Sequence, residues 1–220
     1  MIFEELEVWF DPVARAGPEA MAVDEWLLGI RERPLLRIYG WDGKWGSLGY
    51  FGNLQEARDR MPGLEWVRRW TGGGTVDHSE DWTYSLIVPK GHAVAELKGG
   101  ESYRQIHEVL VRVLRDEVGT VSLSTGGGED SGSCFENPVE YDVEDGTGTK
   151  LAGAAQRRGK FGLLHQGSVL CAGGDWRLRG EIFTESLAKS WSEEEIFVDE
   201  RRVAELVKRK YGAQNWLERC

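Results

Sequence analysis

The sequence predicts an α+β fold with a mixed, largely antiparallel sheet. Two observations carry this prediction. Helical and strand-like segments are interspersed without a strict βαβ alternation, and three strand-like segments follow one another in the second half, separated by glycine-containing breaks typical of hairpins. The 220 residues contain no internal repeat and no low-complexity linker, so we expect a single domain over residues 1–220.

In the first half, an apolar stripe at helical spacing predicts a helix over residues 19–33, directly after Pro18. The stripe consists of Met21, Trp26, Leu27 and Ile30. Runs of apolar and aromatic residues predict strands over residues 35–41, 64–70 and 83–88.

In the second half, the clearest helix covers Glu101–Val118, and Gly119 ends it. Its apolar face consists of Ile106, Leu110, Val113 and Leu114. The glycine- and serine-rich stretch Ser122–Ser133 predicts a mobile loop. Three strands and a charged helix are then predicted over Pro138–Val143, Lys150–Arg158, Phe161–Leu170 and, for the helix, near Asp199–Tyr211.

Composition excludes several classes of function. The formal net charge of −10 argues against general nucleic-acid binding, although a local basic patch is compatible with it. No apolar run predicts a membrane span, and the acidic N-terminus lacks the basic region of a signal peptide. The three cysteines are scattered and the four histidines lack ligand spacing, so we expect no disulfide framework, no metal site and a cytoplasmic location.

Three segments carry residues suited to chemistry. The first, residues 68–78, places two arginines before the triplet Gly72, Gly73 and Gly74, and His78 follows. Successive glycines let the backbone approach a ligand closely, and Arg69 favours an anionic partner. A plain turn and a solvated arginine pair are the alternatives here. No Gly-Lys-Ser/Thr follows the triplet, so it is not a Walker loop.

In the second segment, Lys150 precedes the small residues Ala152–Ala155, which include Gly153 and Ala154. Small side chains leave room for an apolar ligand, and the ammonium supplies a point charge for a carbonyl or phosphate oxygen. The third segment places Cys134 at the end of the glycine- and serine-rich loop. Buried, inert cysteines are common, but a position at the edge of a flexible loop favours a reactive thiol.

Together these motifs resemble the lipoate branch of the biotin/lipoate protein ligase superfamily. The resemblance rests on MAVDEWLL at 21–28, LRIYGWDGKWGSLGYF at 36–51, RRWTGGGTVDH at 68–78 and KLAGAAQRR at 150–158. It implies one catalytic domain, a mixed sheet flanked by helices, and a tunnel for an acyl chain. It also implies attachment of an octanoyl or lipoyl group to a lysine of a lipoyl carrier domain.

The resemblance assigns roles residue by residue. The glycine triplet, Arg69 and His78 would line the acyl and carboxyl site, His78 as a polar wall. Lys150 would hydrogen-bond the reactive carbonyl, and Gly153 and Ala154 would belong to the floor of the tunnel. Cys134 would accept the acyl group as a thioester, with Lys150 lowering the pKa of its thiol.

Two chemistries divide this family. The segment Cys134-Phe135-Glu136-x-Pro138-x-x-Tyr141-Asp142 resembles octanoyltransferases of the LipM type, which need no cofactor. Lipoate-protein ligases instead use ATP and Mg²⁺, show Asp-Gly-Asn after the triplet and usually have an accessory C-terminal domain; we expect none here. Gly74 is ligase-like, however, and the order His165-Gln166 reverses that of the transferases. The ligase and a non-catalytic homologue that binds lipoyl domains are therefore the alternatives.

The resemblance also implies partners. The acceptor would be a lipoyl carrier domain, either the glycine cleavage H protein or the E2 component of a 2-oxoacid dehydrogenase. An acyl carrier protein is a possible donor. Carrier domains are typically acidic, so docking on this acidic chain requires a local basic face, for which we expect Arg68, Arg69, Arg157, Arg158 and Lys160.

Overall fold

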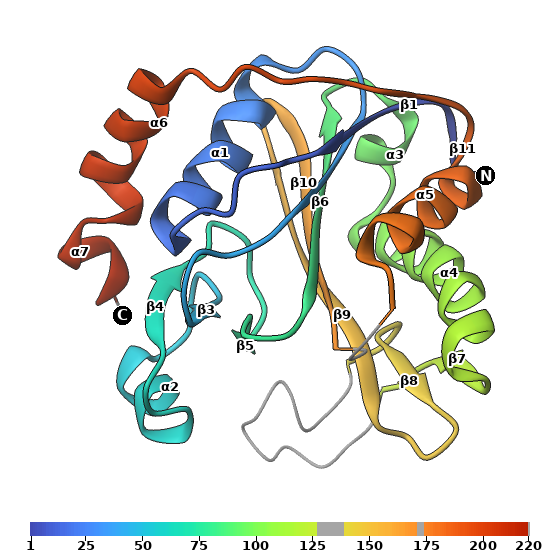
Figure 1. Cartoon of the computed structure of the whole chain (residues 1–220), viewed down its shortest axis with the longest axis horizontal. Coiled ribbons are helices and arrows are strands. Elements are labelled where there is room, and N and C mark those ends of the chain that lie inside the picture. The colour runs from blue at the N-terminus through green and yellow to red at the C-terminus, as the bar shows by residue number, and fades with distance from the viewer. Residues whose placement is uncertain (127–138, 171–173, 220) are drawn as a thin grey trace.

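A computed structural model of the protein describes residues 1–126, 139–170 and 174–219. Its centre is an eight-stranded mixed sheet (Figure 1). In spatial order the strands are β11 (Ala188–Glu193), β1 (Phe3–Phe10), β2 (Leu35–Tyr39), β6 (Trp82–Pro89), β10 (Gly162–Val169), β9 (Lys150–Gly159), β8 (Val143–Asp145) and β7 (Val121–Leu123). Strand β1 is parallel to β11 and β2, and all neighbours from β2 to β7 are antiparallel, which confirms the predicted fold class.

Helices cover both faces of this sheet (Figure 1). One face packs against α1 (Gly17–Ile30), and α6 (Glu200–Leu206) and the π-helical turn η1 (Val207–Tyr211) pack on α1. The other face packs against α4 (Gly99–Val118) and α5 (Trp176–Leu187). The short helix α3 (Ala93–Glu96) follows β6. Leu86 and Val88 belong to the core under α4 and α5, whereas Ile87 belongs to the core under α1. This alternation follows from the two-residue repeat of a strand.

A second, three-stranded sheet has the order β4 (Glu65–Arg68), β3 (Trp45–Leu48), β5 (Thr75–Asp77). Helix α2 (Leu54–Arg60) follows β3, and α7 (Gln214–Leu217) packs against β4. In Figure 1 this sheet lies beyond the end of α1, beside the lower part of the large sheet. Residues 69–74, which include the glycine triplet, connect β4 to β5, and residues 78–81 connect β5 to β6. The glycine triplet therefore lies where the two sheets meet.

Most predicted elements are confirmed, with small corrections. Gly119 ends α4 in the left-handed region (φ 86°), where a residue without a Cβ is favoured. Ile30, the last residue of α1, is 43% exposed and does not belong to the buried stripe. None of the helices within the described ranges is long and apolar enough to cross a membrane.

The strand predicted over Pro138–Val143 is wrong in its described part. Residues 139–142 form a turn and the strand begins at Val143, whereas Pro138 lies outside the described residues. Tyr141 has a φ of 70°, which a strand does not allow, and the Val139 amide donates to Asp142 Oδ2 at 2.9 Å. Of the predicted loop Ser122–Ser133, residues 122–123 belong to β7 and residues 127–133 are outside the described ranges.

Candidate active site

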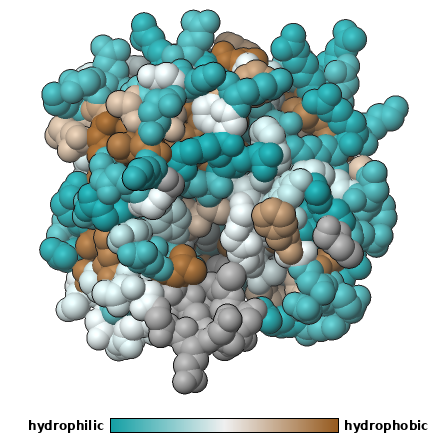
Figure 2. Space-filling model, turned by 180° about the vertical axis from the view of Figure 1, so that it is seen from behind, coloured by the Kyte–Doolittle hydropathy of each residue, from teal (hydrophilic) through white to brown (hydrophobic). Residues whose placement is uncertain are grey.

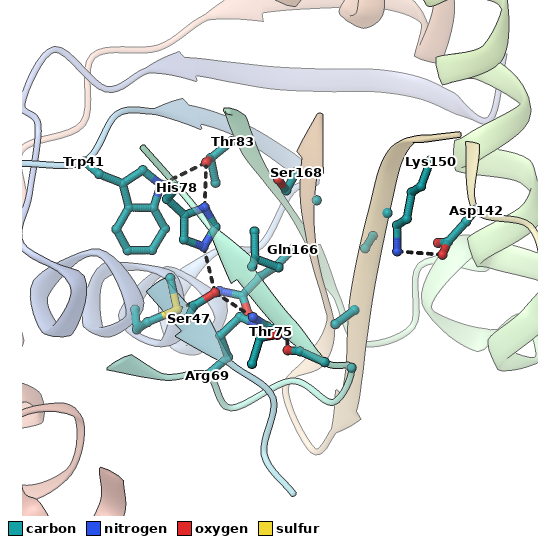
Figure 3. Close-up of a pocket in the computed structure, with 18 of the residues that line it drawn as sticks. Trp41, Ser47, Arg69, Thr75, His78, Thr83, Asp142, Lys150, Gln166 and Ser168 are labelled. Atoms are coloured by element: carbon teal, nitrogen blue, oxygen red, sulfur yellow. Dashed lines mark hydrogen bonds and ion pairs between the residues drawn. The ribbon is translucent and has the colours of Figure 1, made fainter. Parts of the chain in front are cut away.

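A cavity lies between the small sheet and the large sheet (Figure 3). We call the segment with the triplet Gly72, Gly73 and Gly74 the glycine loop. The walls of the cavity come from this loop and from α1, β3, β6, β9 and β10. Figure 3 shows Trp41, Ser47 and His78 gathered on one side and the Lys150–Asp142 pair on the other. The cavity therefore has two chemically different ends, which we call the Lys150 end and the His78 end.

The glycine loop contributes Gly73 and Gly74 to the cavity wall. Gly73 has a φ of 80°, and a Cβ at Gly49 would lie 1.8 Å from the Gly73 carbonyl oxygen, so both positions need glycine. Gly72 is not among the residues that line the cavity. Its carbonyl oxygen instead accepts a hydrogen bond from Arg69.

Arg69 lines the cavity, as expected, but its guanidinium also binds the protein itself. Nη1 donates to Ser47 Oγ at 2.6 Å, and Nη2 donates to the carbonyl oxygens of Gly72 (3.1 Å) and Gly74 (2.8 Å). Arg69 is 5% exposed and Arg68 is 0% exposed. The expectation that these two arginines form part of an exposed docking face is therefore wrong.

At the Lys150 end, Lys150 begins β9 and its Nζ lies 2.7 Å from Asp142 Oδ2. The side chain of Asp142 is 1% exposed and that of Lys150 is 11% exposed. The hydroxyl of Tyr103, from α4, donates to Asp142 Oδ1 at 2.5 Å and accepts from the Ala154 amide at 2.8 Å. This chain orients the ammonium and gives it a buried counter-charge.

Gly153 leaves the space that Lys150 occupies. A Cβ at residue 153 would lie 2.6 Å from Lys150 Nζ and 3.1 Å from Asp142 Oδ1. Gly153, Ala154 and Ala155 all line the cavity, as the sequence predicts. Ala152 differs, because it belongs to the apolar core under α4 and α5.

Cys134 lies outside the described residues, so its distance from Lys150 stays open. The first described residue after it, Val139, lines the cavity together with Lys150 and is 53% exposed.

At the His78 end, His78 stacks on Trp41 with ring centroids 4.0 Å apart and is 7% exposed. His78 Nδ1 lies 2.8 Å from Asp81 Oδ2, and Nε2 lies 2.7 Å from Ser47 Oγ. Because a carboxylate only accepts, Nδ1 carries the proton and Nε2 accepts from the serine. His78 lies in the cavity wall, where we expect it.

Asp81 anchors this end of the cavity. Besides His78, its Oδ2 accepts from Thr83 Oγ1 at 2.9 Å and from Ser168 Oγ at 2.6 Å. Thr83 in turn accepts from the indole nitrogen of Trp41 at 2.9 Å. Most polar groups of this wall are therefore joined to one another, whereas Asp81 Oδ1 is buried without a hydrogen-bond partner among the described residues.

A buried chain that the sequence analysis misses holds the glycine loop. Thr71 Oγ1 donates to Gln166 Oε1, and Gln166 Nε2 donates to Asp24 Oδ2, each at 2.7 Å. Asp24 is fully buried in α1 and pairs with Arg37 Nη1 at 2.7 Å. The one available signal was an aspartate within the apolar stretch MAVDEWLL.

Two histidines, His165 on β10 and His107 on α4, are fully buried and do not line the cavity. His165 is not among the cavity residues; its Nε2 lies 3.1 Å from the Tyr84 hydroxyl, and its Nδ1 lies 2.9 Å from Gln156 Nε2. Burial lowers the pKa of His165 well below its usual value, and burial lowers that of His107 to about 4. Both are therefore neutral at pH 7. Within the described ranges, no group of three or more histidine, cysteine, aspartate or glutamate residues could hold a metal ion.

The chain is similar in sequence to curated octanoyltransferases. The octanoyltransferase LipM of Kyrpidia tusciae is 37% identical over 169 residues, which are 68% of this chain and 60% of that protein. This chain thus spans about three fifths of the length of such curated relatives. Other octanoyltransferases LipM, including that of Staphylococcus aureus, are 33–37% identical.

Two solved structures share the fold over 99% of both chains. Protein Ta0514 of T. acidophilum, which has also been solved with bound lipoic acid, matches with a TM-score of 0.76 at 20% identity. A lipoate-protein ligase A bound with ATP matches with a TM-score of 0.71, also at 20% identity. The family model for the lipoyl protein ligase A/B catalytic domain matches residues 17–209. The chain therefore belongs to the family of lipoyl protein ligase A/B catalytic domains.

Proposed function

We propose that this chain transfers an octanoyl or lipoyl group to a lysine of a lipoyl carrier domain. The observation that carries the proposal is Lys150, held by Asp142 in a cavity floored by small residues, in a chain 33–37% identical to octanoyltransferases LipM. Burial of an acyl chain in the cavity supplies affinity, at about 0.8 kcal/mol for each methylene removed from water.

The proposed reaction has two steps through Cys134. Its thiolate attacks the carbonyl carbon of the donor thioester, the bond from that carbon to the donor sulfur breaks, and the donor leaves as a thiolate. The neutral amine of the carrier lysine then attacks the acyl-cysteine, loses a proton, and regenerates the thiolate. In both steps Lys150 donates a hydrogen bond to the oxyanion, while Asp142 and Tyr103 orient its ammonium. Asp142 and Tyr103 are thus positioning residues.

The alternative is a lipoate-protein ligase that uses ATP and Mg²⁺. The ligase that shares the fold is bound with ATP. In this structure, however, Arg68 and Arg69 donate to carbonyl and hydroxyl oxygens of the protein itself, so neither guanidinium is placed to receive a nucleotide phosphate. We therefore derive no step through ATP.

The test measures the mass of a lipoyl-domain acceptor by mass spectrometry after incubation with the enzyme. The donor is either an acyl carrier protein that carries an octanoyl group, or free lipoate with ATP and Mg²⁺. We expect the acceptor to gain an octanoyl group without ATP, and the enzyme to form an adduct that Cys134→Ala abolishes. Acylation only with lipoate and ATP would establish the ligase instead. A domain that binds but is never acylated would indicate a non-catalytic homologue.

A further inference from the structure

Four cations gather near the C-terminal end of the described chain. Arg157, Arg209, Lys210 and Arg219, which we call the C-terminal cation cluster, come from β9, from η1 and from the residues after α7. Aromatic rings separate three of them. Arg157 Cζ and Lys210 Nζ lie 4.3 Å and 4.0 Å from the centroid of Trp70, and Arg219 Cζ lies 4.0 Å from that of Tyr50. The rings hold the cations in place by cation–π attraction.

Two residues of the cluster, Arg209 and Arg219, line a shallow surface hollow together with Asn215 and Trp216. The Arg219 guanidinium carbon also lies 5.0 Å from the Trp216 centroid. A guanidinium stacked on a ring keeps its N–H edge directed outward, where it matches the two oxygens of a carboxylate. The donors around the hollow therefore suit an acidic side chain.

Arg68 holds this region against the rest of the site. Its guanidinium donates to the carbonyl oxygens of Leu217 and Arg219, both at 2.8 Å. On its other side it donates to the carbonyl oxygens of Gly49 (3.1 Å) and Gly52 (2.8 Å). Residues 49–52 in turn contact the glycine loop. Arg68 thus joins the C-terminal segment to the loop that lines the cavity.

The cluster also begins beside the cavity. Arg157 follows Ala155 on the same side of β9, and Ala155 lines the cavity. Two residues of a strand advance the chain by about 7 Å. Arg157 Nη1 donates to the Trp70 carbonyl oxygen at 3.2 Å, just before the glycine triplet. Through Arg157 the cluster therefore begins about 7 Å along β9 from a residue that lines the cavity.

Gathering like charges in this way costs folding free energy. Glu25 forms an ion pair with Lys210, while burial, Arg157 and Arg209 all lower the pKa of Lys210. The whole chain carries a net charge of −10, so its other surfaces repel an acidic partner. Figure 2 shows a largely hydrophilic face on which apolar side chains lie scattered in small groups.

We propose that the C-terminal cation cluster is the docking surface for an acidic face of the lipoyl carrier domain, with one acidic side chain in the hollow beside Trp216. This inference rests on the proposed function. A protein partner fits better than a single phosphate, because the cations extend over β9, η1 and the segment after α7. The cluster replaces the docking face expected from Arg68 and Arg69, and it keeps Arg157.

The experiment titrates an apo lipoyl domain into the enzyme and measures Kd, alongside kcat and KM for acyl transfer. Arg219→Glu should raise Kd and KM about tenfold and leave kcat within about twofold. Arg209→Glu serves as the second variant, because its side chain is exposed and its replacement does not threaten folding. Lys189→Glu, on β11 at the far edge of the sheet, is the matched charge-reversal control and should change nothing.

Salt should weaken binding by the wild type more than binding by the variants. Unchanged Kd and KM in both variants would overturn the docking surface, even if acyl transfer proceeds. Inorganic phosphate that binds the cluster while the domain binds equally well to both variants would also overturn it. Conversely, a domain that binds through the cluster but is not acylated would support this surface and contradict the proposed function.

Discussion

The two ends of the cavity contain hydrogen-bonded chains of similar length. At the Lys150 end, an ammonium pairs with Asp142, and Tyr103 supports the carboxylate. At the His78 end, Ser47 hydrogen-bonds His78, and Asp81 orients the ring. The second arrangement has the nucleophile, base and acid order of a hydrolase triad. Arg69, however, donates to Ser47 Oγ as well, and Ser47 is 0% exposed.

This difference shows that residue types and distances do not by themselves define a reactive centre. Ser47 Oγ is fully buried and already hydrogen-bonds both His78 and Arg69, whereas the Lys150 side chain is 11% exposed at the cavity. We therefore propose that the chemistry takes place at the Lys150 end and that the His78 end shapes the acyl site. The following predictions test that division.

Lys150→Ala should have the largest effect. Loss of the ammonium removes the proposed oxyanion donor, so the rate of octanoyl transfer should fall by roughly 10²–10³-fold. Lys189→Ala, a lysine on β11 whose side chain is 62% exposed, is the matched control and should keep the wild-type rate. An equal loss in both variants would remove Lys150 from the mechanism.

Acidification should destabilise the protein because of His107, which is buried behind the Lys150 end. Burial lowers the pKa of His107 from 6.5 to about 4, so the native state binds fewer protons than the unfolded state between these values. The contribution of His107 to the free energy of unfolding is therefore complete above pH 6.5. The free energy of unfolding then falls by up to about 3 kcal/mol as the pH decreases to 4. Denaturant unfolding at pH 7 and pH 4.5 measures it.

His107→Asn is the variant for this prediction. Its side-chain amide can still donate to the Tyr141 carbonyl oxygen, as His107 Nδ1 does at 2.6 Å, but it does not titrate. The loss of stability on acidification should be smaller in the variant, with His165 responsible for part of the remainder. An identical pH dependence in both proteins would contradict a buried, neutral His107.

Gly153→Ala should disturb the Lys150 end by shape alone. The new methyl group would lie only 2.6 Å from Lys150 Nζ, so it would displace the ammonium from Asp142. We expect kcat to fall about tenfold, since small displacements of catalytic groups have large kinetic costs. Gly159→Ala on the same strand has nothing within 4 Å of the added Cβ and should be silent. Equal activity in the two variants would show that the position of Lys150 is unimportant.

His78→Asn should have the smallest effect on the chemical step. It weakens the wall that joins Ser47 and Asp81, so we expect a higher KM for longer acyl chains and a kcat within about threefold of the wild type. Steady-state kinetics with acyl donors of different length provide the measurement. A collapse of kcat would make His78 a base and reverse the comparison.

Local patterns predict much of the fold. The periodic faces of α1 and α4 and the hairpin of β9 and β10 depend on neighbouring residues, and the structure confirms them. Strands β1 and β11 were missed because they pair with each other across almost the whole chain, as in Phe3 with Ala188. Strand β3 was missed because Gly46 makes room for the Trp66 ring, a reason that only tertiary packing supplies.

The site shows the same contrast between residues predicted from local motifs and residues placed by tertiary packing. Lys150 and the glycine triplet follow from motifs contiguous in the sequence. The partners Asp142, Tyr103 and Gln166 are supplied by other elements, so their roles depend on the way these elements pack. Arg68 is the clearest example, because its role as a buried support for the C-terminal segment depends on residues about 150 positions away.

The proposal that the chemistry takes place at the Lys150 end and not at the His78 end is tested most directly by the single-turnover rate of octanoyl transfer to a lipoyl domain. The rate is measured side by side for Lys150→Ala and Ser47→Ala. The account predicts a rate at least about a hundredfold below wild type for the first variant and within about threefold of wild type for the second. A larger loss in Ser47→Ala than in Lys150→Ala would place the chemistry at the His78 end and contradict the account.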